Sequence, residues 1–140
     1  MKIFSTILIY FIFLGCLSPD KSLGEKVTML YYEAFKKNDY DTILNLYSKD
    51  FYKTTPQNEW KDTLLKVKNK LGNILNYELI SWKIKRYRGI GIGGIYYNFV
   101  YNVKYSNYLA TEKITLYQLN NNDEIRILGH DIQSGGFIGE

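Results

Sequence analysis

The feature that most constrains the fold is a long stretch of alternating side chains around residue 100. Apolar and aromatic residues occupy every second position, and the positions between them are mostly polar. The first set is Ile95, Tyr97, Phe99, Tyr101, Val103 and Tyr105, and the second is Tyr96, Asn98, Val100, Asn102, Lys104 and Ser106. Since neighbouring side chains of a β-strand point to opposite faces of a sheet, this stretch predicts a long strand with one buried face.

Three shorter runs of the same kind flank this strand, at residues 80–84, 114–116 and 125–127. Turn-forming residues separate the four runs: a glycine-rich segment at 89–94, an Asn-Tyr pair at 107–108 and an Asn-rich segment at 120–123. Four consecutive strands joined by short turns predict an antiparallel meander.

The residues before the strands follow helical spacing. Ser22 and Glu25 have the spacing of a capping box, so a first helix is expected to begin at Ser22. Asp39 is placed to cap a second helix, and Thr55-Pro56 to begin a third that ends at Gly72. Their apolar stripes are Leu23, Val27, Leu30, Tyr31, Ala34 and Phe35; Tyr40, Ile43, Leu44 and Tyr47; and Trp60, Leu64, Val67 and Leu71. The predicted class is α+β, with three N-terminal helices packed on one face of a four-stranded antiparallel sheet.

The N-terminus reads as an export signal. Residues 3–14 are almost entirely apolar, but as a helix they would span only about 18 Å, well short of a bilayer core. Phe13-Leu14-Gly15-Cys16 follows and resembles the cleavage site of bacterial lipoproteins, in which the cysteine sulfur receives lipid, palmitate among the acyl chains. The resemblance implies a signal peptide at 1–15, a lipidated tether at 16–21 and a single domain at 22–140. Removal at an ordinary secretory site, with Cys16 unmodified, is the alternative.

The resemblance also implies localisation. A lipidated Cys16 would hold the protein on a bacterial membrane of the cell envelope through its acyl chains. Leu17 stands where an Asp retains some lipoproteins in the inner membrane, which favours the outer membrane if the host is Gram-negative.

Composition excludes several functions. The 18 basic and 14 acidic residues give a net charge of +4, which is too small an excess to indicate a nucleic-acid partner. One His and one Cys make a metal site improbable, so we expect no metal. The glycines at 89–94 contain a G-x-G-x-x-G pattern, but a strand and not a helix is predicted to follow, so no cofactor is expected.

The order of helices and strands resembles the cone-shaped, cystatin-like fold of the ketosteroid isomerase and nuclear transport factor two superfamily. Residues 35–41 and 46–51 are similar to its first helix turn and pocket-end segment, and the resemblance covers about residues 22–134. Among its members the chain is most similar to small bacterial lipoproteins of unassigned activity. The resemblance implies a curved sheet, an interior that serves as a ligand pocket in some members, and an exposed sheet face that forms dimers in others.

Two sets of residues are therefore candidates for function. The pocket set, which packing of the core explains equally well, is Trp82, Tyr97, Phe99, Tyr101, Tyr105 and His130. The interface set, on the opposite face, is Tyr96, Asn98, Asn102, Thr115 and Tyr117. Lys83, Lys85, Arg86 and Arg88 form a basic stretch that suits a solvated strand face, or a patch for anionic lipid or an acidic partner.

No constellation has the pattern of a catalytic site, so no catalytic residue is assigned. The first hypothesis is a membrane-anchored, non-catalytic domain that binds a protein partner or forms a homodimer through its sheet face. The second is a small-molecule pocket protein or isomerase-like enzyme in which His130 or Asp131 transfers a proton. These two residues are adjacent on a strand and point to opposite faces, so they cannot form a dyad with each other.

Overall fold

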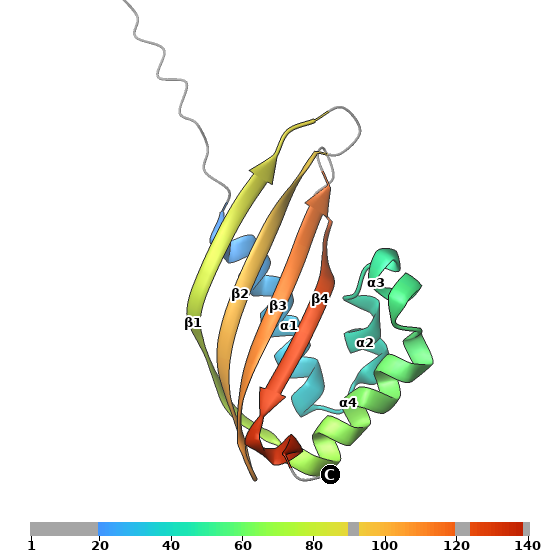
Figure 1. Ribbon diagram of the computed structural model, residues 1–140, viewed down its shortest axis with the longest axis vertical. Coiled ribbons are helices and arrows are strands. Elements are labelled where there is room, and N and C mark those ends of the chain that lie inside the picture. The colour runs from blue at the N-terminus through green and yellow to red at the C-terminus, as the bar shows by residue number, and fades with distance from the viewer. Residues whose placement is uncertain (1–19, 90–92, 120–123, 139–140) are drawn as a thin grey trace, which may run out of the picture.

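Four helices precede four strands in the described part of the chain. The computed structural model describes residues 20–89, 93–119 and 124–138, so the predicted signal peptide and all of the predicted tether before residue 20 lie outside it (Figure 1). The helices are α1 (Lys21–Lys36), α2 (Tyr40–Asn45), α3 (Lys49–Thr54) and α4 (Gln57–Leu71). The strands are β1 (Ile74–Tyr87), β2 (Gly94–Tyr105), β3 (Leu109–Leu119) and β4 (Ile125–Ser134), and a 3-10 turn, η1 (Gly135–Phe137), follows. The α+β class is confirmed.

The number of helices differs from the three predicted. The additional helix, α3, begins where the Ser48 hydroxyl accepts a hydrogen bond from the backbone N–H of Phe51 at 3.1 Å. Phe51 is its buried residue and packs against Tyr47 and Trp60. Because α3 has six residues and one buried anchor, it has no repeating stripe from which a helix could be predicted.

Helix ends follow local chemistry, with two corrections to the predicted N-caps. α1 begins one residue earlier than expected, because the Asp20 carboxylate accepts from the Ser22 backbone N–H at 2.9 Å and takes the capping role predicted for Ser22. Asp39 caps α2 as predicted, accepting from the Thr42 N–H at 3.1 Å. The predicted cap at Thr55 is wrong, because Pro56 is the N-cap of α4, no side chain caps the helix there, and the first helical residue is Gln57. The last residue of α4 is Leu71, and Gly72 is its C-cap, as predicted.

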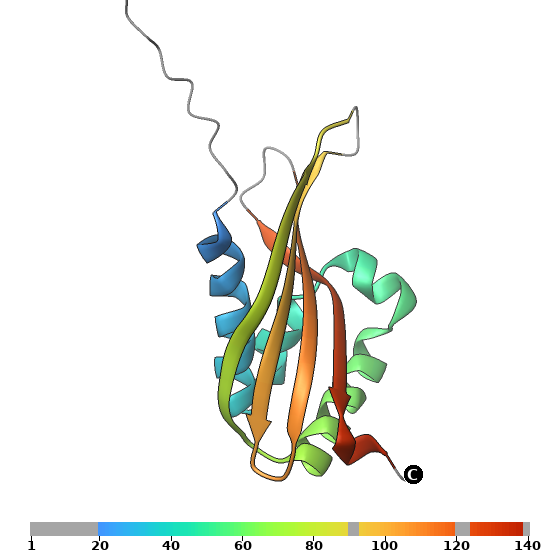
Figure 2. The same cartoon turned by 60° about the vertical axis from the view of Figure 1, so that its left-hand side comes forward.

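The sheet is an antiparallel meander with strand order β1-β2-β3-β4, as predicted. It curves, and the four helices lie against one of its faces (Figures 1 and 2). Tyr97, Phe99, Tyr101, Val103 and Tyr105 of β2 point to that inner face and are buried, which confirms the alternation. The outer face has no helix on it in the described structure.

The two ends of the molecule differ in what they carry. The start of α1 and the connected ends of β1 and β2 lie at one end, and the β2–β3 turn, the end of α4 and η1 lie at the other (Figures 1 and 2). Lys21 and Trp82 mark the first end, since the Lys21 ammonium lies 5.5 Å from the centre of the Trp82 ring. Residues 90–92 and 120–123, which include much of two predicted turns, lie outside the described residues.

Candidate functional site

A buried polar network lies between the helices and the inner face of the sheet. Glu112 comes from β3 and His130 from β4, and their side chains have no exposed surface. The Glu112 Oε2 lies 2.9 Å from the His130 Nε2, and its Oε1 accepts a hydrogen bond of 2.6 Å from the Tyr105 hydroxyl. The Tyr32 hydroxyl donates a longer bond of 3.3 Å to Oε2.

The network continues on the far side of the imidazole. The His130 Nδ1 lies 2.7 Å from the Tyr47 hydroxyl, so both ring nitrogens have partners. The ring is enclosed by aromatic neighbours: its centre lies 4.9 Å from that of Tyr31 and 5.7 Å from that of Trp60. Such an arrangement holds the imidazole in one orientation. Its partner Tyr47 also lines a hollow of about 480 Å³ beside α2 and α3.

Burial dominates the chemistry of the tyrosines in this network. It raises the pKa of Tyr47, Tyr32 and Tyr105 well above the ordinary tyrosine value, and the negative charge of Glu112 raises the pKa of each further. The three hydroxyls therefore stay protonated over any physiological pH. A protonated hydroxyl can donate to the carboxylate, which is the role that Tyr105 and Tyr32 have here.

The predicted pocket residues do not form one site. Tyr97, Phe99, Tyr101 and Tyr105 are buried in the core beneath the helices. Tyr105 and His130 are brought together through Glu112, whereas Tyr101 bonds to Thr28 at 2.6 Å. Trp82 is separate: it is 53% exposed, at the end of the sheet beside Lys21.

Glu112 is the residue that sequence reasoning missed. It occupies an inward position of β3, between Ala110 and Ile114, where the alternation calls for an apolar side chain. A buried carboxylate needs hydrogen-bond donors around it. A Glu at an inward position of the alternation could therefore have indicated a buried polar network. Asp131, the neighbour of His130, is exposed and accepts a hydrogen bond from Gln133 at 2.7 Å.

The predicted interface residues lie together on the outer face. Tyr96 is opposite Tyr117 across β2 and β3, with ring centres 4.8 Å apart, and Tyr87 contacts Tyr96 at 5.2 Å. Next to this aromatic cluster the Thr115 hydroxyl donates to the Asn98 side-chain oxygen at 3.1 Å. The cluster needs Gly94, because a Cβ there would lie 2.3 Å from the Tyr117 ring.

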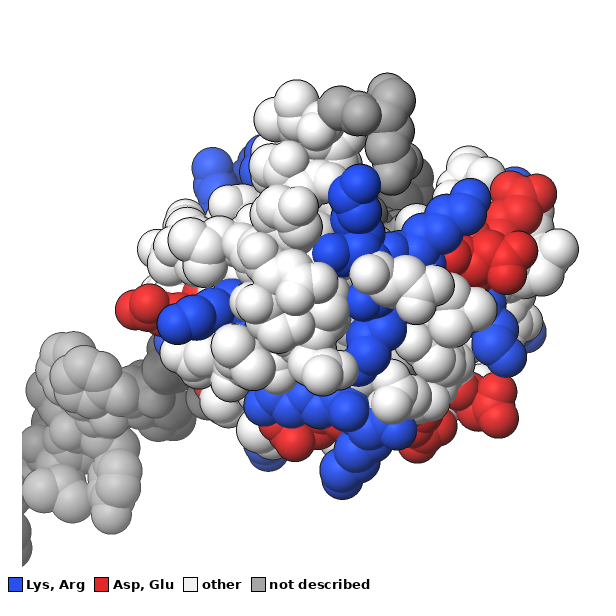
Figure 3. Space-filling view, turned by 90° about the horizontal axis from the view of Figure 1, so that it is seen from below, with Lys and Arg blue, Asp and Glu red and all other residues white. Residues whose placement is uncertain are grey.

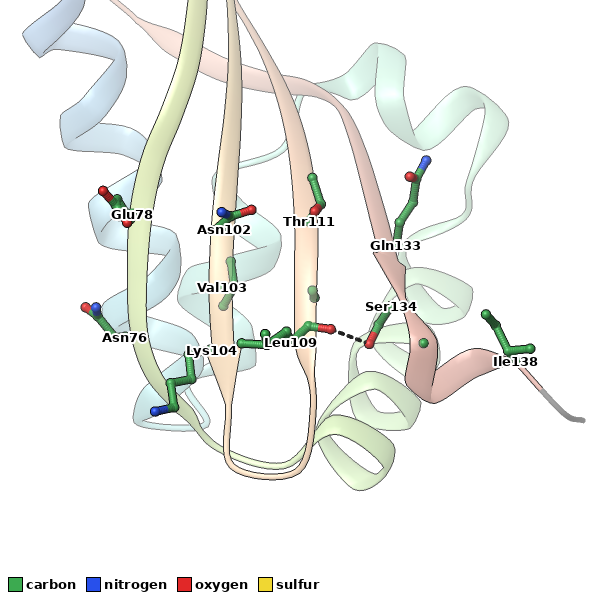
Figure 4. A pocket seen from close by; sticks show the side chains of 12 residues that line it. Asn76, Glu78, Asn102, Val103, Lys104, Leu109, Thr111, Gln133, Ser134 and Ile138 are labelled. Carbon is green, nitrogen blue, oxygen red and sulfur yellow. Dashed lines mark hydrogen bonds between the residues drawn. The ribbon is translucent and has the colours of Figure 1, made fainter.

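A polar row crosses the same face further along the strands. Glu78, Asn102, Thr111 and Gln133 are paired in register across all four strands (Figure 4). They line a shallow hollow of about 650 Å³. Its lower border includes Leu109, whose carbonyl accepts a hydrogen bond of 2.7 Å from Ser134. Neutral amides and a hydroxyl in a row can hydrogen-bond a partner's backbone or side chains.

A second hollow lies at the aromatic end of the outer face. It has a volume of about 580 Å³ and is lined by Lys85, Tyr87, Arg88, Gly89, Tyr96 and Asn98. Neither hollow is lined by Glu112 or His130. These two hollows thus lie on the outer face of the sheet, and the buried network lies on the other face.

Two further features were sought in the described residues. No group of three or more His, Cys, Asp or Glu side chains there is placed to hold a metal ion. No helix in the same part of the chain is long and apolar enough to cross a bilayer.

Comparison with known proteins relates the chain by fold only. No protein-family model matches it, and no curated protein matches it. Among solved structures it is similar to that of Bd1075 of Bdellovibrio bacteriovorus, with a TM-score of 0.54 and 14% sequence identity. The likeness covers 79% of this chain but only 38% of that one. The chain therefore corresponds to well under half of its structural neighbour, with which it shares the arrangement of helices and antiparallel sheet.

Proposed function

We propose that the chain is a membrane-anchored lipoprotein of a bacterial envelope whose domain binds a protein partner or a second copy of itself, without catalysis. The observation that carries this proposal is the distribution of polar groups between the two faces of the sheet. Those on the inner face are buried and bonded to one another, and those on the outer face lie open. We assign the domain to the cone-shaped, cystatin-like superfamily, a proposal supported by the order of its elements and the curvature of its sheet.

The interior supports a structural role for His130. A proton-transfer group must come within hydrogen-bond reach of its substrate, and the His130 side chain has no exposed surface and two bonded nitrogens. Asp131 is open to solvent, but Gln133 is its hydrogen-bond partner and no histidine is beside it on the outer face. The isomerase-like alternative would require the aromatic core to open.

The outer face has the composition of a binding surface. Tyrosines supply large contact area at low entropic cost, and here Tyr87, Tyr96 and Tyr117 form one cluster. The polar row of Glu78, Asn102, Thr111 and Gln133 extends the surface away from that cluster. An aromatic centre with polar groups around it is typical of protein interfaces.

The test is photo-crosslinking in cells that express the full chain. A photoreactive residue at Asn102, on the outer face, is expected to give a crosslinked product, and one at Met29, on the exposed side of α1, is expected to give none. Tyr96→Ala with Tyr117→Ala should weaken association about tenfold by sedimentation and remove the product. Met29→Ala with Leu30→Ala removes exposed apolar area from α1 and serves as the matched control.

The mass of the product separates a second copy from a different protein. Absence of any product at Asn102 would contradict the proposed surface, as would equal yields at Asn102 and Met29. Circular dichroism of the tyrosine variants checks that the fold is retained.

A further inference from the structure

We propose that the end of the sheet formed by β1 and β2 binds the anionic lipid headgroups of the membrane that carries the anchor. This inference rests on the proposed lipid attachment at Cys16 and adds an orientation to it. The domain would stand on the bilayer with this end down, which leaves the polar row on the outer face directed along or away from the membrane.

Charge is the first support. Lys83, Lys85, Arg86 and Arg88 are all exposed and lie within six residues of one another. Between Glu78 and Glu112 the sequence contains no Asp or Glu. The hollow at this end, lined by Lys85 and Arg88, accordingly has no carboxylate in its lining. Alternation along β1 places Lys83 and Lys85 on the outer face and Arg86 on the opposite face, so basic side chains lie on both faces of this end of the strand. Each basic side chain near an anionic bilayer strengthens binding, so this end is a suitable match for such a surface.

Exposed aromatic side chains accompany the charges. Trp82 is 53% exposed and Tyr87 is 49% exposed. Tyr87 lines the basic hollow and contacts Tyr96, so it stands where the basic end of the sheet meets the aromatic cluster proposed to bind a protein partner. Trp and Tyr have an apolar ring with a polar group and are enriched at the headgroup level of membranes. If this end of the sheet faced only water, the same rings would leave apolar surface exposed without a binding partner.

The position of the anchor is the third support. Three residues lie between Cys16 and Asp20, so a lipidated cysteine can lie no more than about 14 Å from the Asp20 cap of α1. The sheet projects beyond that start, since β1 continues for five residues after Trp82, or about 17 Å (Figures 1 and 2). The maximum length of the tether and the distance by which the sheet extends past α1 are therefore similar. The lipidated Cys16 and the end of the sheet can thus contact the same membrane surface.

The two ends of the domain differ in how their charged side chains are arranged. Figure 3 shows the opposite end, where basic and acidic side chains lie beside one another. At the anchored end the acidic side chains of α1 have local partners, since Glu25 is paired with Lys21 at 3.4 Å and Asp20 accepts from the Ser22 N–H at 2.9 Å. The three cations of β1 and Arg88, which follows it, have no carboxylate in their own segment, residues 83–88. Charge complementarity thus favours this end for an anionic surface.

Fluorescence of Trp82 tests the orientation. The lipidated full chain is reconstituted into vesicles of phosphatidylcholine, or of equal parts phosphatidylcholine and phosphatidylglycerol, both containing a brominated lipid as quencher. The chain has two tryptophans, and Trp60 is buried, so the difference from a Trp82→Phe variant isolates the signal of Trp82. Quenching of Trp82 is expected to be several-fold stronger with phosphatidylglycerol and to fall as salt screens the charges.

Two double variants with reversed charge test whether the basic residues at this end cause the binding. Lys85→Glu with Arg88→Glu should abolish the effect of phosphatidylglycerol, and Lys66→Glu with Lys104→Glu, the same charge change on α4 and near the far end of β2, should retain it. Quenching that is equal in the two vesicle types, or equally lost in both double variants, overturns the proposal.

A separate experiment tests the lipid attachment at Cys16. Cys16→Ser is expected to release the protein from the membrane fraction of the cells that express it. If Cys16→Ser leaves the membrane fraction unchanged, the proposed attachment is wrong. If it releases the protein but Trp82 is not quenched in the lipidated chain, the attachment stands and the orientation is wrong.

Discussion

One carboxylate organises the interior of this domain. Glu112 receives hydrogen bonds from Tyr105 and Tyr32 and contacts His130, whose other nitrogen contacts Tyr47. A carboxylate that is buried without partners would cost several kcal/mol, so these contacts are required for the fold. They also specify which strands and helices lie together, since the five residues come from α1, the segment after α2, β2, β3 and β4.

Removing the Glu112 carboxylate is therefore expected to destabilise the domain. Glu112→Ala should lower the free energy of unfolding by about 3 kcal/mol, because it leaves two hydroxyls and an imidazole nitrogen without their buried acceptor. The measurement is the midpoint of urea denaturation. Glu78→Ala, on the exposed outer face, is the control and should change the free energy by less than about 0.5 kcal/mol. Equal midpoints for the two variants would contradict this account.

Two residues, Gly72 and Asn73, join α4 to β1. Gly72 ends α4 with φ of 91°, a conformation that residues with a Cβ rarely adopt. The following residue, Asn73, receives a hydrogen bond from Ser106 at its carbonyl and donates to the Ser106 hydroxyl. Asn107 of the same turn donates to the carbonyl of Leu71. The end of the helix is thereby joined to the β2–β3 turn.

Gly72→Ala is expected to strain this junction. The new Cβ would lie 2.0 Å from the Ser106 hydroxyl oxygen, in a backbone conformation that already disfavours alanine. We expect a loss of about 1–3 kcal/mol in the free energy of unfolding, measured by thermal or urea denaturation. Gly89→Ala provides the comparison, since a Cβ there meets no atom within 4 Å. The idea would fail if both variants unfolded at the same denaturant concentration.

At the level of the whole molecule, the core is built from tyrosine to an unusual degree. The chain has 14 tyrosines, and Tyr31, Tyr32 and Tyr97 are among the largest fully buried side chains. Burial raises the pKa of Tyr31 well above the ordinary value of 10.0 and that of Tyr101 to about 12. Protonated tyrosine is thus favoured by the fold over tyrosinate.

Stability should consequently decline in alkali. Because the unfolded chain releases tyrosine protons near pH 10.0 and the folded chain does not, the stabilising effect is complete below that pH and is lost progressively as the pH rises above it. Tyrosinate absorbance and circular dichroism, followed together, should show a group of tyrosines ionising in the same step as unfolding. Complete ionisation with an unchanged circular dichroism spectrum would be inconsistent with the buried core.

Local pattern determined most of the elements. The alternation of residues 95–105 specifies a strand because side-chain direction reverses at every residue, and Asp39 and Gly72 specify helix ends through contacts with their immediate neighbours. The short helix α3 was not predicted because one buried anchor makes no period. The capping role of Asp20 was missed because Ser22, two residues on, offers a competing oxygen to the same helix start.

The interior network was decided by tertiary structure. Glu112 and His130 are 18 residues apart in the sequence, and Tyr32 is 80 residues from Glu112. No local period connects them, because their contact depends on the pairing of β3 with β4 and on the packing of α1 against the sheet. The sequence by itself therefore determined which face of each element is apolar. Only the assembled fold decided that its one histidine is held in the core, since the partners that enclose it come from distant parts of the chain.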